Sequence, residues 1–380
     1  MPALLRYFLR LGTLGFGGPI VLAGHMQQDL VERRGWISAQ EYKEGLAFAQ
    51  LAPGPLAAQL AIYLGWVRAR SLGATMVGLA FVGPSFLMVL LLSALYVRYG
   101  GLPWMQGLFY GIGAAVIAII ARSVLKLVRM TLGRDQILWL LFTASGLMTA
   151  WTESEIVWVF LLCGLVPMFL RGRHAAPVTP AFALLPAAPG LATGLGGPAS
   201  LGVLWKIVTY FAGAGLFVFG SGLAVVPFLY GGVVRQFHWL TERQFIDAVA
   251  VSMITPGPVV ITVAFIGYLV AGLAGAILAA IGVFLPVYLI TVLVAPHFHR
   301  VAKSRQVKAF VDGVTAAATG AIAGAAVILG RRSLVDLPTI VIALVTLALL
   351  LAPRKIPEPV LIVAAGLVGL VLKGVVPATG

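Results

Sequence analysis

Apolar residues fill most of this chain in long runs, and short clusters of polar residues separate the runs. Many runs come close to or exceed about 20 residues, the length that an α-helix needs to cross the hydrocarbon core of a bilayer. Their polarity does not alternate along the chain, as it does in the strands of a membrane β-barrel. The pattern predicts about twelve helical segments. They cover roughly residues 4–24, 45–66, 73–97, 104–128, 136–151, 155–170, 204–230, 248–270, 273–295, 309–329, 337–352 and 359–376.

The apolar pattern of the first half returns in the second half at a nearly constant offset. Up to a Pro-Gly-Pro motif the two copies lie 203 residues apart, and beyond it they lie 202 residues apart. The matched positions are Tyr7 with Tyr210, Phe16-Gly17 with Phe219-Gly220, Trp36 with Trp239, Pro53-Gly54-Pro55 with Pro256-Gly257-Pro258, Gly65 with Gly267, and Pro84 with Pro286. We therefore expect an all-α polytopic membrane protein with two homologous repeats, residues 1–170 and 204–380. Residues 171–203 are expected to be a linker, either a loop or a poorly formed re-entrant segment.

The positions of basic loops favour an inverted second repeat. In the first half the basic loops follow the second and fourth apolar segments, at residues 68–70 and 122–134. In the second half the strongest basic loop, residues 297–308, follows the third segment of its repeat. Because cytoplasmic loops carry an excess of Lys and Arg, this shift predicts opposite orientations for the two repeats. Arg331 and Arg332 argue the other way, and the number of crossings stays open between 10 and 13.

Composition places the chain in the membrane and weakens other assignments. The 380 residues are 61% hydrophobic and 10% charged, whereas soluble domains carry about 25% charged residues. The formal net charge of +14 comes from 26 Lys and Arg against 12 Asp and Glu. The positive-inside rule explains most of this excess, so the charge is weak support for an anionic substrate. Arg6 and Arg10 within the first apolar stretch do not fit a signal peptide. Cys163, the single cysteine, is expected to fill space.

Pro53-Gly54-Pro55 interrupts an apolar segment, and Pro256-Gly257-Pro258 does so again in the second repeat. Proline removes a helical hydrogen bond and glycine adds backbone freedom, so each motif should split its segment into two half-helices. The half-helix after the break would point its N–H groups and the positive end of its dipole at the break, which suits an anion. A broken helix in both repeats is typical of a transporter's binding site. A simple packing kink is the alternative.

Further residues near the breaks are candidates for substrate binding. The glycine clusters near Phe16 and Phe219 either allow close helix packing or form a second pair of breaks. His25 is either a donor at the pore mouth or an interfacial histidine. Gln50 and Thr255 would add polar groups to the first and second break. The candidate substrate-binding residues are Phe16, Gly17, Gly18, Pro19, His25, Gln50, Pro53, Gly54, Pro55, Ser85, Phe219, Gly220, Ser221, Thr255, Pro256, Gly257 and Pro258.

Charged residues within the apolar segments are few. Glu44 and Asp247 are equivalent, and each precedes the first proline of its motif by nine residues. They are either helix-end charges or a proton-titrating pair that couples transport to a proton gradient. Asp312 is a further acidic candidate. Arg10 and Arg122 could attract an anion within the membrane, although snorkelling to the surface explains both.

Motifs for other chemistries are missing from the sequence. It contains no phosphate-binding loop of the Walker type, no dinucleotide fingerprint, no Cys or His metal spacing and no nucleophile elbow. We therefore expect no catalytic residue, no metal, no cofactor and no nucleic-acid partner. A membrane enzyme acting on lipid-linked phosphate would need a clustered nucleophile and base, which the sequence does not offer.

The combination of motifs resembles the chromate ion transporter family, in its long two-domain bacterial form. The residues that carry the resemblance are Phe16-Gly17-Gly18-Pro19, Trp36, Gln50, Pro53-Gly54-Pro55, Gly65, Pro84-Ser85-Phe86, Phe219-Gly220, Pro256-Gly257-Pro258 and Pro286. The resemblance implies a multi-pass protein of the bacterial inner membrane that exports chromate and confers resistance to it. A proton gradient or the membrane potential would drive this secondary transport. An anion channel of the same architecture is the alternative.

The second copy departs from the first at several of these positions. Gly18-Pro19 becomes Ser221-Gly222, Gln50 becomes Met253, and Ser85 becomes Val287. We therefore expect an asymmetric binding site with more polar groups from the first repeat. The expected partners are a small inorganic oxyanion, with chromate before sulfate-like anions, and the lipid bilayer. The oligomeric state is left open, with a homodimer as one option.

Overall fold

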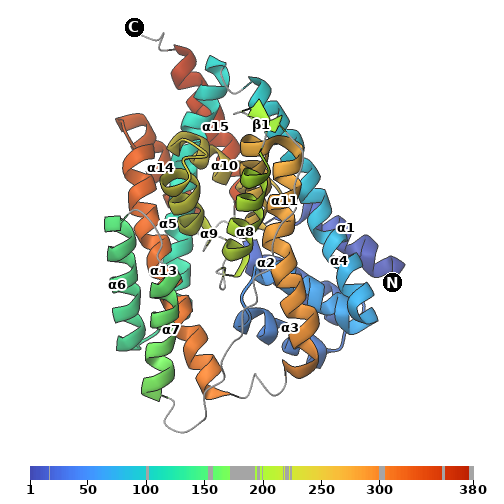
Figure 1. Cartoon of the computed structure of the whole chain (residues 1–380). Coiled ribbons are helices and arrows are strands. Elements are labelled where there is room, and N and C mark those ends of the chain that lie inside the picture. Colours follow the sequence, from blue (N-terminus) through green and yellow to red (C-terminus); the bar gives the residue numbers. More distant parts are fainter. Residues whose placement is uncertain are drawn as a thin grey trace.

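The protein is almost entirely helical in the computed structural model (Figure 1). The structure describes residues 1–16, 18–99, 102–152, 157–171, 193–194, 197–198, 200–216, 218, 222, 225–298, 304–352 and 356–375. The first repeat contains α1 (Pro2–Leu14), α2 (Gly18–Met26), the π-helical η1 (Gln27–Arg33), α3 (Ala39–Leu51), α4 (Leu56–Tyr99), α5 (Pro103–Thr131), α6 (Gln136–Thr152) and α7 (Val157–Arg171).

The second repeat follows a two-residue ladder of β1 (Thr193–Gly194) and β2 (Gly197–Pro198). Its helices are α8 (Leu201–Leu216), α9 (Val225–Leu229), η3 (Tyr230–Gln236), α10 (Glu242–Ile254), η4 (Val259–Ile261), α11 (Thr262–Val294), η5 (Ala295–His297), α13 (Arg305–Ser333), α14 (Leu337–Leu351) and α15 (Glu358–Val375). Most of the expected linker lies outside the described residues.

Equivalent local signals start and bend equivalent helices. Ser38 caps α3 through a capping box with Glu41, and Thr241 caps α10 through a capping box with Gln244. Each box satisfies backbone N–H groups that the first helical turn leaves without partners. Both residues of the box differ in type between the repeats, yet both helices are 13 residues long. The local chemistry of the cap is therefore preserved through the duplication.

Each repeat begins with two antiparallel helical hairpins. In the first repeat, α1 packs against α2 and η1, where Gly15 lies against Leu22 and the Arg34 guanidinium lies 5.8 Å from the centre of the Tyr7 ring. The second hairpin pairs α3 with the start of α4, and the rings of Phe48 and Tyr63 stack 5.6 Å apart. The segment predicted as one helix at 4–24 is therefore two helices that fold back on each other.

The helix α4 also folds back on itself, where the sequence predicted two separate segments. Its backbone leaves the helical region at Ala69 and at Arg70, which has φ 50°, and the backbones of Gly65 and Gly73 come into contact beside the bend. The equivalent bend in α11 lies at Ala271 and Gly272, with φ 61° at the glycine. Glycines at the close approach are required because a Cβ there would meet backbone atoms of the facing helix.

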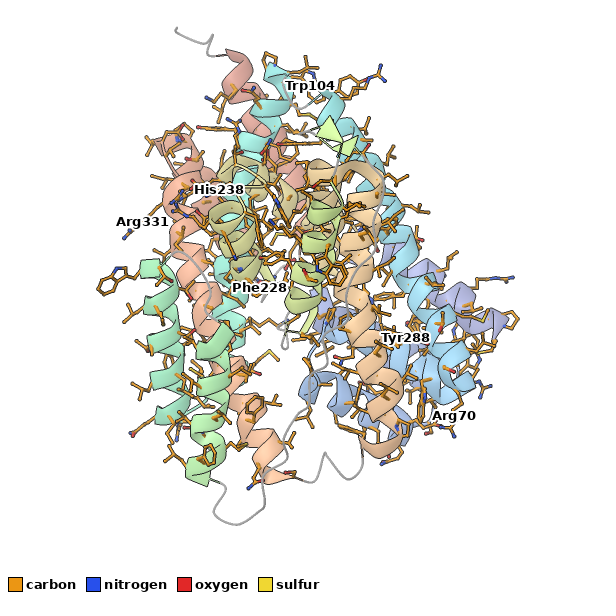
Figure 2. The ribbon with its side chains drawn as sticks, viewed as in Figure 1. Arg70, Trp104, Phe228, His238, Tyr288 and Arg331 are labelled. Atoms are coloured by element: carbon orange, nitrogen blue, oxygen red, sulfur yellow. The ribbon has the colours of Figure 1, made fainter. Side chains whose placement is uncertain are left out.

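The two repeats are inverted with respect to each other, as the charge pattern predicted. The beginning of the long part of α4 lies beside the end of α11, where the Thr75 and Tyr288 hydroxyls are 2.8 Å apart. The end of α4 lies beside the beginning of α11, where the Tyr96 and Phe265 rings are 5.2 Å apart. In Figure 2, Arg70 at the bend of α4 and Tyr288 in the second half of α11 both lie at the right, and Trp104, which follows the end of α4, lies at the top. Equivalent helices therefore run antiparallel.

The repeats exchange their last three helices. The helix α5 packs against α14 and α15 of the other repeat, and α13 packs against α6 and α7. Gly111 lies against Ala365 and its equivalent, Gly313, lies against Cys163, so both contacts bring helix backbones close together. One group of helices thus contains α1–α4 and α8–α11, and the other contains α5–α7 and α13–α15 (Figure 1).

Within the described residues, four helical stretches are long and apolar enough to cross a membrane, namely Leu56–Tyr99, Pro103–Thr131, Val259–Val294 and Gln306–Ser333. Shorter apolar helices lie at Val159–Leu170, Leu201–Leu216 and Leu337–Leu351. Large apolar side chains such as Leu79 and Leu87 are exposed on the outside of α4, where lipid would cover them. The protein is therefore a multi-pass membrane protein.

Candidate functional site: a cation-lined cavity beside the helix breaks

The breaks of the two repeats meet at the centre of the molecule. We call the interruption between α1 and α2, or between α8 and α9, the glycine break, and each Pro-Gly-Pro motif the proline break. The Gly54 N–H donates to the Val218 carbonyl at 2.7 Å, and the Gly257 N–H donates to the Gly15 carbonyl at 2.9 Å. These two bonds are equivalent, because Gly15 corresponds to Val218 and Gly54 to Gly257. Each proline break is therefore bonded to the glycine break of the other repeat.

The geometry at the proline breaks requires glycine. Gly54 has φ 144° and Gly257 has φ 100°, a region that other residues rarely adopt. A Cβ on Gly54 would also meet the Val287 and Gln59 side chains. Because both amides already donate to carbonyls, these two N–H groups are not available to an anion. The first backbone N–H groups of the helices that follow the breaks have no partner within their own helix, so they remain the expected donors to an anion.

Polar side chains near the breaks hold the backbone in place. The Ser85 hydroxyl is buried and donates to the Gly12 carbonyl at 3.2 Å, and Ser85 also contacts Gly257. The Gln59 amide donates to the Pro53 carbonyl at 3.1 Å. The Thr255 hydroxyl donates to the Val251 carbonyl within its own helix at 2.7 Å. The hydroxyls of Ser85 and Thr255 therefore donate to backbone carbonyls, and their role as polar contacts to a substrate stays a prediction.

A cavity of about 600 Å³ lies beside the breaks, between the two groups of helices. We call it the central cavity. Gly15 and Gly257 form its wall at the breaks, and Thr131 and Lys308 lie at its far end. Since Thr131 is the last residue of α5 and Lys308 is in the first turn of α13, the cavity reaches the end of the molecule where these helices meet the basic loops.

The structure brings some of the predicted site residues to this cavity and places others elsewhere. Those that line it are Phe16, Gly18, Pro19, Gln50, Thr255 and Gly257. Those that lie in described parts of the chain but outside its wall are His25, Pro53, Gly54, Pro55, Ser85, Pro256 and Pro258. Gly17, Phe219, Gly220 and Ser221 lie outside the described residues.

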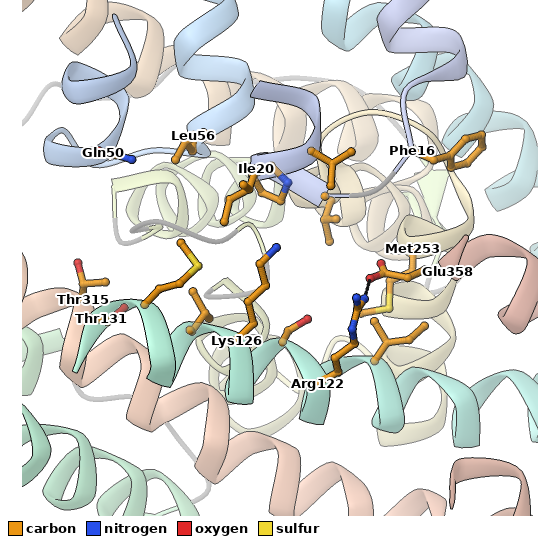
Figure 3. A pocket seen from close by; sticks show the side chains of 18 of the residues that line it. Phe16, Ile20, Gln50, Leu56, Arg122, Lys126, Thr131, Met253, Thr315 and Glu358 are labelled. Carbon is orange, nitrogen blue, oxygen red and sulfur yellow. Dashed lines mark hydrogen bonds and ion pairs between the residues drawn. The ribbon is translucent and has the colours of Figure 1, made fainter. Parts of the chain in front are cut away.

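The charged groups of the central cavity come from the exchanged helices. The Arg122 guanidinium of α5 forms an ion pair with the Glu358 carboxylate of α15 at 2.8 Å. Lys126 lies one turn further along α5 on the same face, and its side chain extends into the cavity (Figure 3). Within the described part of the chain, no carboxylate pairs with Lys126. Asp312 and Lys308 of α13 complete the charged lining.

Sequence reasoning identified Arg122 as a cation within the membrane but missed Lys126 and Glu358. Arg122 and Glu358 are 236 residues apart and belong to different repeats. Only the exchange of α5 and α15 brings them together. The spacing of Arg122 and Lys126, four residues apart, was the one signal available, because such residues share a helix face.

The two equivalent carboxylates have different surroundings, and neither lines the central cavity. Asp247 is buried, with 4% of its surface exposed, and accepts a hydrogen bond of 2.7 Å from the Tyr96 hydroxyl. Glu44 is half-buried and accepts a hydrogen bond of 2.7 Å from the Gln40 amide. The duplication therefore preserved the carboxylate but changed its environment.

Inverted repeats, broken helices that meet centrally and a polar cavity beside them define a membrane transport protein. A family model described as "Chromate transporter" matches residues 2–168 and 205–370. The chain belongs to the chromate transporter family.

Relatives cover nearly the whole chain. It is 58% identical over 377 residues to a chromate transport protein of Cupriavidus metallidurans, which covers 97% of this chain and 92% of the relative. It is 52% identical over 382 residues to a probable chromate transport protein of Synechococcus elongatus, covering 97% and 94%. A chromate transport protein of Pseudomonas aeruginosa is 30% identical over 385 residues, covering 97% and 91%. No solved structure is significantly similar to the chain.

Proposed function

We propose that this protein is a secondary active transporter that exports chromate from the cytoplasm across the bacterial inner membrane. The observation that carries the proposal is the cation-lined central cavity, which ends at hydrogen-bonded helix breaks of both repeats. Relatives named for chromate transport match the chain over 97% of its length. Sulfate-like oxyanions, which share the tetrahedral shape and double charge, are the secondary substrates.

Arg122 and Lys126 supply the positive charge for a divalent anion. Both project from the same face of α5, and both line the central cavity. Arg122 can offer two parallel N–H donors to two oxygens of a tetrahedral oxyanion, while Lys126 acts as a point charge. Gln50 lines the wall opposite and offers an amide donor. Glu358 forms an ion pair with Arg122 when no substrate is bound, and chromate would replace Glu358 as the partner of Arg122.

The position of the cavity supports an opening toward the cytoplasm. The central cavity extends to Thr131 and Lys308, and the basic residues Arg129 and Arg134 lie at the same end of α5. Under the positive-inside rule this end faces the cytoplasm. The bonds between the breaks close the opposite end of the cavity. Loading from the cytoplasm followed by rearrangement at the breaks would produce export.

Asp247 and Glu44 are the groups that we assign to proton coupling. Asp247 is buried against Tyr96 within the helix that leads to the second proline break. An ionisable group in that position can link a change of charge to movement of the break. A proton gradient, or the membrane potential acting on a divalent anion, would then drive transport.

Chromate uptake by inside-out vesicles tests this function. With an imposed proton gradient, vesicles containing the protein should accumulate chromate above its external concentration, and collapse of the gradient should release it. The double variant Pro53→Ala with Pro55→Ala, which removes both prolines from the turn between α3 and α4, should accumulate none. Equal accumulation by the wild type and this variant would contradict the proposal. Flux that only equilibrates chromate, whatever the gradient, would identify a channel.

A further inference from the structure

A second basic site lies between α1 and the pair α2–η1. A groove of about 460 Å³ follows the first hairpin, and we call it the basic groove. Its charged lining consists of Arg6, Arg10, His25, Asp29, Arg33 and Arg34. Among the described residues, only Gly15 lines both this groove and the central cavity. The basic groove is therefore a separate site, and the proposed function assigns nothing to it.

Positive charge in the basic groove is left largely uncompensated. Asp29 is its single carboxylate, and it pairs with Arg33 at 3.1 Å. The Arg34 guanidinium lies over the Trp36 ring at 4.6 Å, which fixes its plane without neutralising it. No described carboxylate pairs with Arg6 or Arg10, which lie one helical turn apart on α1. Several cations that line one groove raise the local positive potential, which attracts an anion.

The Tyr7 hydroxyl gives a second, independent sign of a ligand. Tyr7 lines the basic groove and is buried, with 7% of its surface exposed. Its hydroxyl has no hydrogen-bond partner among the described residues. A buried hydroxyl without a partner costs about 1–3 kcal/mol in protein mutational data, so native structures seldom leave one unsatisfied. A ligand oxygen in the groove would accept this hydrogen bond.

The second repeat shows how the same hairpin folds without a ligand site. There the equivalent Tyr210 donates its hydroxyl to the Phe228 carbonyl at 2.6 Å. The Tyr210 and Phe228 rings stack 5.1 Å apart, and the Phe237 and Trp239 rings stack 4.6 Å apart. Figure 2 shows Phe228 within this packed region. In the sequence, Arg6, Arg10, His25 and Arg34 correspond to Thr209, Gly213, Phe228 and Phe237.

The hairpin therefore needs none of these four basic residues for its fold. We propose that the basic groove binds a tetrahedral oxyanion group, either the phosphate of an anionic phospholipid or a free oxyanion. Arg6, Arg10 and Arg34 neutralise it, and the Tyr7 hydroxyl donates to one of its oxygens. Leu14 lines the groove and is exposed on α1, where an acyl chain of a bound phospholipid would lie.

Binding to the purified full-length protein tests the proposal and distinguishes the two sources. Native mass spectrometry measures retention of phosphatidylglycerol against phosphatidylcholine, and equilibrium dialysis measures binding of labelled inorganic phosphate. The test variants are Arg6→Gln with Arg10→Gln, and Tyr7→Phe. The control, Arg129→Gln with Arg134→Gln, removes the same charge from the exposed end of α5.

We expect the arginine variant to weaken binding at least about tenfold, corresponding to loss of charge-assisted hydrogen bonds. The Tyr7→Phe variant should weaken it about threefold without loss of thermal stability, since it removes an unsatisfied hydroxyl. A loss of phosphatidylglycerol alone identifies a lipid site, and a loss of phosphate alone identifies a free oxyanion. The proposal would be overturned if the groove variants bound phosphatidylglycerol and inorganic phosphate as tightly as the control does. None of these readouts depends on transport, so failure here leaves the proposed function standing.

Discussion

The two repeats contribute equally to the hydrogen bonds that join their breaks. Gly54 of the first repeat donates to Val218 of the second, and Gly257 of the second donates to Gly15 of the first. The two crossed hydrogen bonds, the paired caps of α3 and α10, and the paired bends in α4 and α11 agree in position between the repeats. Each of these features fixes backbone geometry. The duplication therefore preserved the parts that bend the chain and bring the two repeats together.

Charged side chains, in contrast, differ between the repeats. Arg122 and Lys126 of α5 correspond to Gly324 and Ile328 of α13. Gly324 packs against the backbone of Gly146, so a side chain there has no room. Of the three described cations that line the central cavity, Arg122 and Lys126 thus come from the first repeat, and Lys308 comes from the second. We infer that the symmetric backbone closes the pathway and that the asymmetric charges select the substrate.

The largest effect is expected from a side chain on the glycine of a proline break. Gly54→Val or Gly257→Val should reduce transport more than tenfold. Each forces a β-branched residue into a positive φ, which costs about 1–3 kcal/mol before any clash. Gly83→Ala is the control, because a Cβ at Gly83 meets nothing within 4 Å. Vesicle transport and thermal unfolding would be measured for all three. If either valine variant transports as well as Gly83→Ala, the crossed bonds are not essential.

Removal of the Glu358 charge should strengthen chromate binding. Glu358→Gln frees Arg122 and removes one negative charge from the central cavity, so we expect the dissociation constant to fall by about threefold to tenfold. Release should slow in proportion, which would lower the maximal transport rate. Equilibrium binding of labelled chromate to the purified protein measures the first effect, and Glu32→Gln, at an exposed position outside both the central cavity and the basic groove, is the control. Weaker binding by Glu358→Gln would show that Glu358 positions Arg122 and does not compete for it.

The two equivalent carboxylates should differ in their effect on proton coupling. Asp247→Asn removes the charge but keeps an oxygen that can accept from Tyr96, so the fold is preserved and the dependence of transport on pH should flatten. Glu44→Gln should flatten the profile less, because Glu44 is half-buried and bonded to Gln40. Transport rates from pH 5.5 to about 8.5 cover the range in which a perturbed carboxyl titrates. If the variant that combines Asp247→Asn with Glu44→Gln keeps a normal pH profile, both carboxylates are only helix-end charges.

The smallest effects are expected at the helix caps, and they should be equal in both repeats. Ser38→Ala and Thr241→Ala each remove a capping hydroxyl, which costs about 1 kcal/mol. Thermal unfolding in detergent would report both losses, while chromate binding should not change. A loss in one repeat only would show that the two hairpins contribute unequally to stability.

Much of the backbone could be predicted from the sequence, because its signals are local. Pro53-Gly54-Pro55 and its copy indicate the breaks by the chemistry of proline and glycine, and the basic loops indicate inversion. The bend of α4 at Ala69 and Arg70 falls between the predicted segments 45–66 and 73–97. The fold-back between α1 and α2 lies instead within the segment predicted at 4–24, where the glycine cluster left close packing and a break as alternatives. The sequence therefore showed that the chain bends, but not at every position where it does so.

The composition of the central cavity could be predicted only in part. Phe16, Gly18 and Gln50 were expected near the substrate because they flank the breaks, and they do line the cavity. The pair of Arg122 and Glu358 depends on the exchange of helices between repeats, which leaves no periodic signal in the sequence. Residues that meet through long-range packing need the three-dimensional structure to be recognised.

The most direct test of the account compares chromate accumulation by inside-out vesicles with and without the cavity cations. Arg122→Gln combined with Lys126→Gln removes both positive charges that α5 directs to the central cavity. Arg129→Gln combined with Arg134→Gln removes the same charge from the end of that helix outside the cavity wall. We expect the cavity variant to lose at least about 90% of gradient-driven accumulation, a tenfold change that corresponds to about 1.4 kcal/mol, while the control keeps most of it. Equal accumulation by the two variants would contradict the assignment of substrate binding to the first repeat's cations.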